Sequence, residues 1–177
     1  MADLSDAPKI LPIATDGEER SCGGCTACCE GGLWDKSMKL SPGNACQHIS
    51  AEGCGIYESR PEKPCRTFKC AWLTQVDEFP DAMRPDRSGV IPVHDRNWYD
   101  WKVIRLFPRV ATVAPDVLQW YVDYAKPQQL PVIFYEYSWE GDNYKGASEK
   151  ALGPPEFAAD VQRMPSESDV FRSLSAG

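Results

Sequence analysis

The chain has 177 residues, of which 42% are hydrophobic, and this is enough for one compact domain with a sizeable core. Its net charge of −7 leaves no basic surface to neutralise phosphates or anionic lipids, so we expect no nucleic-acid partner and no membrane association. The longest apolar runs, such as residues 130–135, are far shorter than the roughly 20 residues that span a bilayer.

Residues 1–21 form an acidic segment without sustained periodicity, and we expect a flexible N-terminal arm. The segment has neither the basic region nor the cleavage site of a secretory signal, which favours a cytoplasmic location. In a reducing compartment, metal binding accounts for clustered cysteines better than disulfides do.

All eight cysteines lie between residues 22 and 70, in a segment rich in glycine and polar turns. Because residues 22–73 hold too few large apolar side chains for a core of their own, this segment requires cross-links to keep its shape. We therefore predict a metal-binding module at 22–73, with thiolate ligands drawn from Cys22, Cys25, Cys28, Cys29, Cys46, Cys54, Cys65 and Cys70.

The opening cluster, Cys22-Gly-Gly-Cys25-Thr-Ala-Cys28-Cys29, contains the Cys-x2-Cys step that brings two sulfurs to one ion. On a short helix, at roughly 100° per residue, Cys28 points about 100° away from Cys29. Either the two adjacent cysteines serve different metals or one of them is not a ligand. Eight thiolates would fill two tetrahedral zinc sites.

Zinc is the predicted metal, with iron or an iron–sulfur cluster as the alternative. The Cys22-x2-Cys25-x2-Cys28 run matches the first three ligands of a bacterial ferredoxin. The fourth ferredoxin spacing and its proline are absent, since Cys29 follows directly and Glu30 comes next. Mononuclear iron held by four thiolates is a third possibility.

Residues 54–70 read Cys-Gly-Ile-Tyr-Glu-Ser-Arg-Pro-Glu-Lys-Pro-Cys-Arg-Thr-Phe-Lys-Cys. With the opening cluster, this segment resembles the YkgJ-type CxxCxxCC family of putative zinc- or iron-chelating proteins. The resemblance covers residues 22–73 and implies metal chelation; related cysteine modules are attached to flagellin lysine methylases. One departure is that three residues, rather than two, separate Arg60-Pro61 from Cys65.

Thiolate charge requires nearby donors. Two filled zinc sites would carry a net charge of about −4 relative to neutral thiols. Backbone N–H groups and basic side chains can offset it. The basic residues beside the cysteines are Lys36, Lys39, Arg60, Lys63, Arg66 and Lys69.

For the other polar and aromatic residues, we expect structural roles rather than catalytic ones. Tyr57, Arg60 and Phe68 are expected to brace the metal loops. His48 is either a solvated loop residue or a metal ligand. The pair His94-Asp95 is either an exposed turn or an oriented catalytic base, and the exposed turn is favoured. The aromatic groups at 98–101 and 120–124 are assigned to the core rather than to a ligand cleft.

Residues 74–177 are rich in aromatic and β-branched side chains and are predicted to form an α+β portion, in one domain with the module. Strands are predicted at 88–95, 102–107 and 130–137, with Pro92 indicating an edge position or a bulge. Helices are predicted at 115–125 and 155–163, each opening on a proline, and a further one from Ser166 with Asp169 in a capping box.

The predicted fold is therefore α+β, a cysteine-rich metal-binding module packed on a small mixed α/β core. The predicted function is zinc binding with a mainly structural role; an iron–sulfur electron carrier and the metal-bearing part of a protein-modifying enzyme remain alternatives. No catalytic constellation stands out, a protein partner is possible, and the sequence names no substrate.

Overall fold

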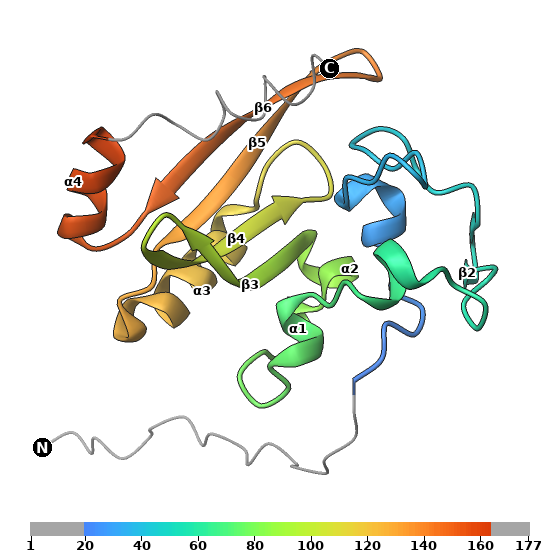
Figure 1. The fold of residues 1–177 in the computed structure, drawn as a ribbon, viewed down its shortest axis with the longest axis horizontal. Coiled ribbons are helices and arrows are strands. Elements are labelled where there is room, and N and C mark those ends of the chain that lie inside the picture. The colour runs from blue at the N-terminus through green and yellow to red at the C-terminus, as the bar shows by residue number, and fades with distance from the viewer. Residues whose placement is uncertain (1–19, 164–177) are drawn as a thin grey trace, which may run out of the picture.

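The computed structural model describes residues 20–163, which form a mixed α+β structure. Its centre is a four-stranded sheet in the order β3 (Val90–Trp98), β4 (Trp101–Pro108), β5 (Val132–Glu140), β6 (Asn143–Leu152). The β3–β4 and β5–β6 pairs are antiparallel, whereas β4 and β5 are parallel (Figure 1). The predicted arm, apart from its last two residues, and the predicted helix from Ser166 lie outside the described residues.

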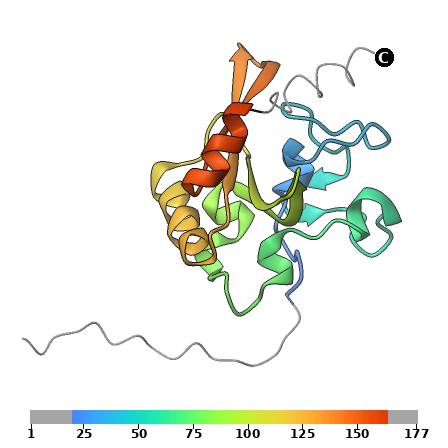
Figure 2. The same cartoon turned by 60° about the vertical axis from the view of Figure 1, so that its left-hand side comes forward.

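Two helices lie against this sheet. α3 (Pro115–Ala125), continued by the short turn η4 (Lys126–Gln128), connects the parallel strands β4 and β5, and α4 (Pro155–Arg163) follows β6 (Figure 2). Both helices have the bounds predicted from their apolar faces and N-terminal prolines.

The two helices cover opposite faces of the sheet. Tyr121 of α3 is fully buried and belongs to the same cluster as Ile104 of β4. Phe157 of α4, 1% exposed, packs instead with Val103, the neighbour of Ile104. Because successive strand residues point to opposite faces, α3 and α4 must lie on different sides.

The strands differ from the predicted ranges in informative ways. β3 begins at Val90, two residues later than predicted, because Ser88 is the last residue of α2 (Pro85–Ser88). Gly89 follows this helix in the left-handed conformation, with a φ of 72°. Pro92 lies on the edge strand, as predicted, and the register shifts between Val93 and Arg96.

Strand β6 was not predicted. Its residues are mostly exposed, and it lacks the apolar alternation by which strands are recognised. It is held by pairing along the whole of β5, from Leu152 opposite Val132 to Asn143 opposite Glu140.

The aromatic groups pack largely as predicted. Trp98 is 2% exposed in the cluster with Phe157, and Tyr121 lies in the cluster with Phe79. Tyr99 is the exception: it is 46% exposed, in the turn between β3 and β4, so its assignment to the core is wrong.

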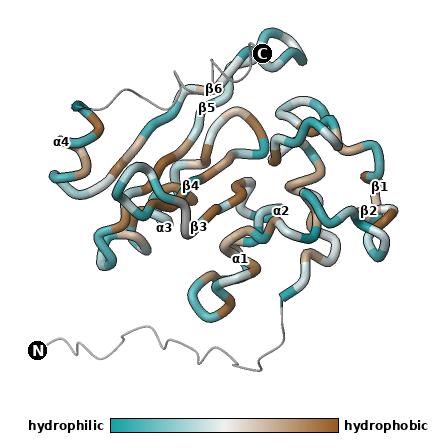
Figure 3. The backbone as a smooth tube through the Cα atoms, viewed as in Figure 1, coloured by the Kyte–Doolittle hydropathy of each residue, from teal (hydrophilic) through white to brown (hydrophobic). Residues whose placement is uncertain are grey.

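The cysteine-rich segment contains little regular structure. It consists of loops joining the helical turns η1 (Cys28–Gly32) and η2 (Glu62–Arg66), the two-residue strands β1 (Ile49–Ser50) and β2 (Gly53–Cys54), and α1 (Ala71–Thr74); a turn η3 (Asp81–Met83) follows. Figure 3 shows many hydrophobic residues around β3 and α3. No helix within residues 20–163 has the length and apolarity needed to cross a membrane.

The segment nevertheless shares the core of the sheet. Ala27, Cys70 and Trp72 are each 5% exposed or less and belong to the cluster that contains Ile104 and Tyr121. The loops that carry the cysteines are thus packed directly against the α3 side of the sheet.

Candidate metal centre

All eight cysteine side chains line one narrow cavity of about 70 Å³. No disulfide joins any of them. Cys46 and Cys70 are buried, and the other six cysteines are half-buried. Sequence positions as far apart as Cys22 and Cys70 are brought together around this space.

The opening cluster reaches the cavity through two tight turns. The N–H of Cys25 donates to the Cys22 carbonyl over 2.8 Å, with Gly23 at a φ of 50° between them. η1 then carries Cys28 and Cys29. Gly31 in η1 has a φ of 98°, and a Cβ there would lie 2.4 Å from the Ser41 carbonyl oxygen, so this position requires glycine.

The later cysteines are positioned by backbone pairing. The N–H of Cys46 donates to the Cys29 carbonyl over 2.7 Å, and the Cys46 carbonyl accepts from Ile49 over 3.2 Å. Ile49 pairs with Cys54 across the β1–β2 hairpin. This chain of contacts holds Cys29, Cys46 and Cys54 in one neighbourhood, while Cys65 arrives from η2.

Three of the thiols pack against the core. Cys70 belongs to the hydrophobic cluster of the α3 side, and Cys25 and Cys28 lie against it. Burial raises the pKa of Cys28 well above its usual value, and the thiols of Cys70, Cys25 and Cys22 add to the rise. We call Cys22, Cys25, Cys28 and Cys70 the inner set.

The remaining thiols form a second group. Burial raises the pKa of Cys29 to about 11, with contributions from Cys46, Cys54 and Cys65 ahead of Cys22. The pKa of Cys65 is likewise raised by burial and then by Cys46 and Cys54. We call Cys29, Cys46, Cys54 and Cys65 the outer set. The two sets are not isolated from each other, because Cys29 also raises the pKa of Cys28 and Cys22 that of Cys29.

The thiols are neighbours without forming a coordination shell. Within the part of the chain that the structure describes, no group of three or more His, Cys, Asp or Glu side chains is arranged to hold a metal ion. Binding an ion would require the sulfurs of a set to turn toward a common centre.

Several buried donors around the cavity fit thiolate ligands. The Nε1 of Trp72 and the Nε of Arg60 are buried without a hydrogen-bond partner among the described residues, and both side chains line the cavity. The hydroxyl of Tyr121 is also buried and has no hydrogen-bond partner in the described part of the chain. Burial raises the pKa of Tyr121, and the Cys70 thiol raises it further. Unsatisfied buried donors are costly, and a thiolate would satisfy them.

Other donors already contact the sulfurs. The guanidinium of Arg60 interacts with Cys22 and lies 3.6 Å above the Tyr57 ring. The backbone N–H of His48 donates to the Cys46 sulfur over 3.5 Å, but the His48 ring does not line the cavity. The pKa of Cys70 is raised to about 11 by burial, and the N–H groups of Leu73 and Trp72 partly oppose the rise.

The predicted bracing residues Tyr57, Arg60 and Phe68 all line the cavity. Of the predicted charge donors, Arg60 alone lines it; the other five side chains are exposed. His94 is not a turn residue. It lies within β3, half-buried, with Nδ1 2.7 Å from Nε2 of Gln75.

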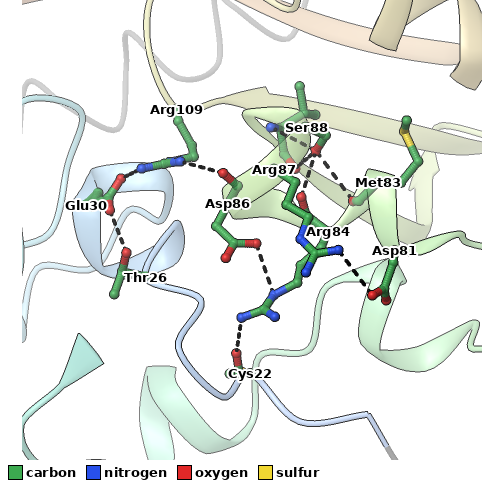
Figure 4. Close-up of polar contacts among 11 residues, drawn as sticks. Cys22, Thr26, Glu30, Asp81, Met83, Arg84, Asp86, Arg87, Ser88 and Arg109 are labelled. Atoms are coloured by element: carbon green, nitrogen blue, oxygen red, sulfur yellow. Dashed lines mark hydrogen bonds and ion pairs between the residues drawn. The ribbon is translucent and has the colours of Figure 1, made fainter. Parts of the chain in front are cut away.

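A polar network that the sequence did not reveal connects the module to α2 and to the end of β4 (Figure 4). Arg84 donates to the Cys22 carbonyl over 3.2 Å and pairs with Asp86 over 3.0 Å. Arg109 pairs with Glu30 and donates to the Asp86 carbonyl over 3.2 Å. These arginines lie outside the cysteine segment, and no local sequence signal links them to it.

Comparisons of the chain with family models, with curated proteins and with solved structures give no match in any of the three. The resemblance to the YkgJ-type family therefore rests on the residues of 22–73 alone.

Proposed function

We propose that this chain binds two zinc ions through its eight cysteine thiolates and that the ions clamp the module in shape. The observation that carries the proposal is that all eight thiols, from segments spread over residues 22–70, line one cavity without a disulfide. Closed sites of four thiolates are typical of structural zinc.

The grouping of the thiols supports one ion in each set. An inner set of four and an outer set of four match the ligand number of tetrahedral zinc. The division also accounts for the adjacent Cys28 and Cys29, which could not easily bind one ion from a single helical turn.

The surroundings support thiolate rather than thiol as the bound form. Trp72 and Tyr121 present buried donors that have no acceptor among the described residues. Such donors stabilise coordinated sulfur and orient it. The module has little core of its own, so the ions would contribute folding free energy of order ~10 kcal/mol, as they do where zinc templates folding.

A four-iron cluster in the inner set is a second candidate. Cys22, Cys25 and Cys28 have the spacing of three ferredoxin ligands, and the structure places the distant Cys70 beside them. Cys70 could then be the fourth cluster ligand in place of the cysteine that is missing from the ferredoxin spacing. On this alternative the chain would be an electron carrier or the cluster-bearing part of an enzyme, as the family resemblance also allows.

Metal and sulfide analysis of anaerobically purified protein separates the two. We expect a colourless protein with two zinc ions and no acid-labile sulfide per chain. Broad visible absorption together with bound iron and sulfide would favour an iron–sulfur cluster over zinc, at least in the inner set. Protein without bound metal after purification in chelator-free buffer would contradict both.

A further inference from the structure

An open cleft of about 470 Å³ lies where the cysteine-rich segment meets the central sheet. The segment contributes Asp35 and five residues between 63 and 69 to its lining, and the edge strand β3 contributes Val93 and His94. No cysteine lines this cleft. Its volume is within the range of about 300–1,000 Å³ that small-molecule sites occupy, so we examined which ligand its side chains would suit.

The charged side chains of the cleft favour an anion. Lys63 and Lys69 are exposed, and neither forms an ion pair within residues 20–163. The one carboxylate, Asp35, already accepts hydrogen bonds at Oδ1 from the Ser37 hydroxyl and the Met38 N–H. The two ammonium groups outnumber this carboxylate on a chain that carries −7 overall, which makes the cleft a local basic site.

His94 is held in place by a chain of hydrogen bonds that leads to α3. The side-chain Nε2 of Gln75 lies 2.7 Å from Nδ1 of His94, and an amide nitrogen can only donate. The Tyr124 hydroxyl lies 3.1 Å from Oε1 of Gln75 and also contacts the carboxylate of Glu78. Because neighbours outside the lining fix the half-buried His94, this residue needs little ordering when a ligand binds.

The apolar part of the lining is anchored in the core. Val93 is 8% exposed and belongs to the cluster that contains Ile104, and Phe68 packs against the same cluster. Pro64 also lines the cleft. An apolar wall that is already formed, combined with a few polar groups, is typical of sites for small organic ligands.

We propose that this cleft binds a small organic anion, a carboxylate or phosphate ester with an apolar body. The anionic group lies at Lys63 and Lys69, and the body lies against Phe68 and Val93. Binding is non-covalent and uses no thiol. The site would therefore give the chain a ligand in addition to metal, whatever the metal is and however the cysteines share it.

Titration of the purified full-length chain with three phenyl probes tests the proposal. Benzoate, phenyl phosphate and benzyl alcohol share a ring and differ in the group that carries the charge. We expect the anions to bind at about millimolar concentrations and the alcohol at least about fivefold more weakly. Binding of one anion alone would identify the preferred group. Equal binding of the alcohol, or saturable binding of neither anion, would overturn the proposal.

The two histidines of the chain report where a probe binds, because His94 lines the cleft and His48 does not. In NMR spectra, benzoate or phenyl phosphate should shift the ring signals of His94 and leave those of His48 in place. The His48→Gln variant assigns the two sets of signals. Binding that leaves the His94 signals unmoved would place the ligand elsewhere and contradict the proposal.

Charge variants test the recognition in both directions. Lys63→Gln/Lys69→Gln should weaken binding of the anionic probe about fivefold, whereas Asp35→Asn, which keeps the Oδ1 acceptor, should strengthen it about twofold. Lys102→Gln/Lys126→Gln, at two exposed lysines outside the cleft, is the matched control and should leave the affinity unchanged. Equal affinities in the two double-lysine variants would overturn the cleft as the anion site.

Discussion

The guanidinium of Arg84 donates a hydrogen bond over 3.2 Å to the carbonyl oxygen of Cys22, a residue 62 positions earlier in the chain. Arg84 also pairs with Asp86 and lies 5.6 Å from the centre of the Trp72 ring. One side chain therefore joins the first cysteine turn, α2 and the wall of the thiol cavity. It is placed to hold the module against the sheet whether or not metal is bound.

Replacing Arg84 with alanine should destabilise the chain by about 1–3 kcal/mol, because a half-buried carbonyl and a carboxylate both lose their partner. Denaturant unfolding of the zinc-loaded protein measures the change. Arg87→Ala is the matched control, since its pair with Asp81 is exposed and such pairs contribute roughly 0–1 kcal/mol. Equal losses in the two variants would contradict the role given to Arg84.

Gly31→Ala should destabilise η1 strongly, by more than about 2 kcal/mol, because the new Cβ would meet the Ser41 carbonyl oxygen and the residue has a φ of 98°. Gly24→Ala is the control in the same cluster, where an added Cβ meets nothing within 4 Å. Thermal unfolding distinguishes them. If both chains melt alike, the backbone path described for η1 is wrong.

Tyr121→Phe tests whether the buried hydroxyl donates to a coordinated Cys70 sulfur. The metal-free chain should be unaffected or slightly more stable, since an unpartnered buried hydroxyl is removed. The variant should bind the inner-set ion about tenfold more weakly, because loss of a hydrogen bond to a metal ligand weakens metal binding by this order. Competition with a zinc chelator measures this.

Tyr137→Phe provides the comparison for that variant. The Tyr137 hydroxyl is also buried without a partner among the described residues, but it lies in the cluster with Phe157, on the other face of the sheet. This variant should leave zinc affinity unchanged. A loss of affinity shared by both variants would indicate a general effect of removing a buried hydroxyl.

The raised thiol pKa values predict a pH dependence that metal should abolish. The pKa of Cys29 and of Cys70 rises from 9.0 to about 11 in the folded chain, mainly through burial. Their contribution to the stability of the metal-free fold is therefore complete below about pH 9 and is lost as the pH rises through about 11.

The melting temperature of the metal-free chain should accordingly fall between about pH 9 and 11 more steeply than that of the zinc-loaded chain, whose coordinated sulfurs have no proton to lose. Thermal scans of the two forms in parallel cancel the titration of groups common to both. Identical pH profiles would show that the thiols are not buried as described.

The sequence was sufficient to predict the elements whose residues carry their own signals. α3 and α4 have apolar faces and initial prolines, and their bounds agree with the structure. β6 has no such signal, because its side chains are mostly exposed and its strand conformation comes from pairing with β5. The four-residue helices α1 and α2 were not predicted either, although α2 begins at Pro85 and is followed by Gly89 in the left-handed conformation.

The candidate site, too, has one part that the sequence predicts and another that depends on tertiary structure. Cysteine spacing predicted that the thiols would gather, and all eight line one cavity. That Cys28 and Cys29 serve different metals, or that one of them is not a ligand, remains a prediction. Which remote cysteine joins which set depends on the β1–β2 hairpin and on the packing of Cys70 against the core. Arg84, Arg109 and Tyr121 come from outside the module, so only the three-dimensional arrangement brings them to it.

Zinc K-edge X-ray absorption of the zinc-loaded, full-length chain tests the central claim most directly, because it counts the ligands around the ion. The account predicts a shell of four sulfurs at about 2.3 Å, averaged over the two ions. A shell containing nitrogen or oxygen at about 2.0–2.1 Å, in place of part of the sulfur, would contradict two closed thiolate sites.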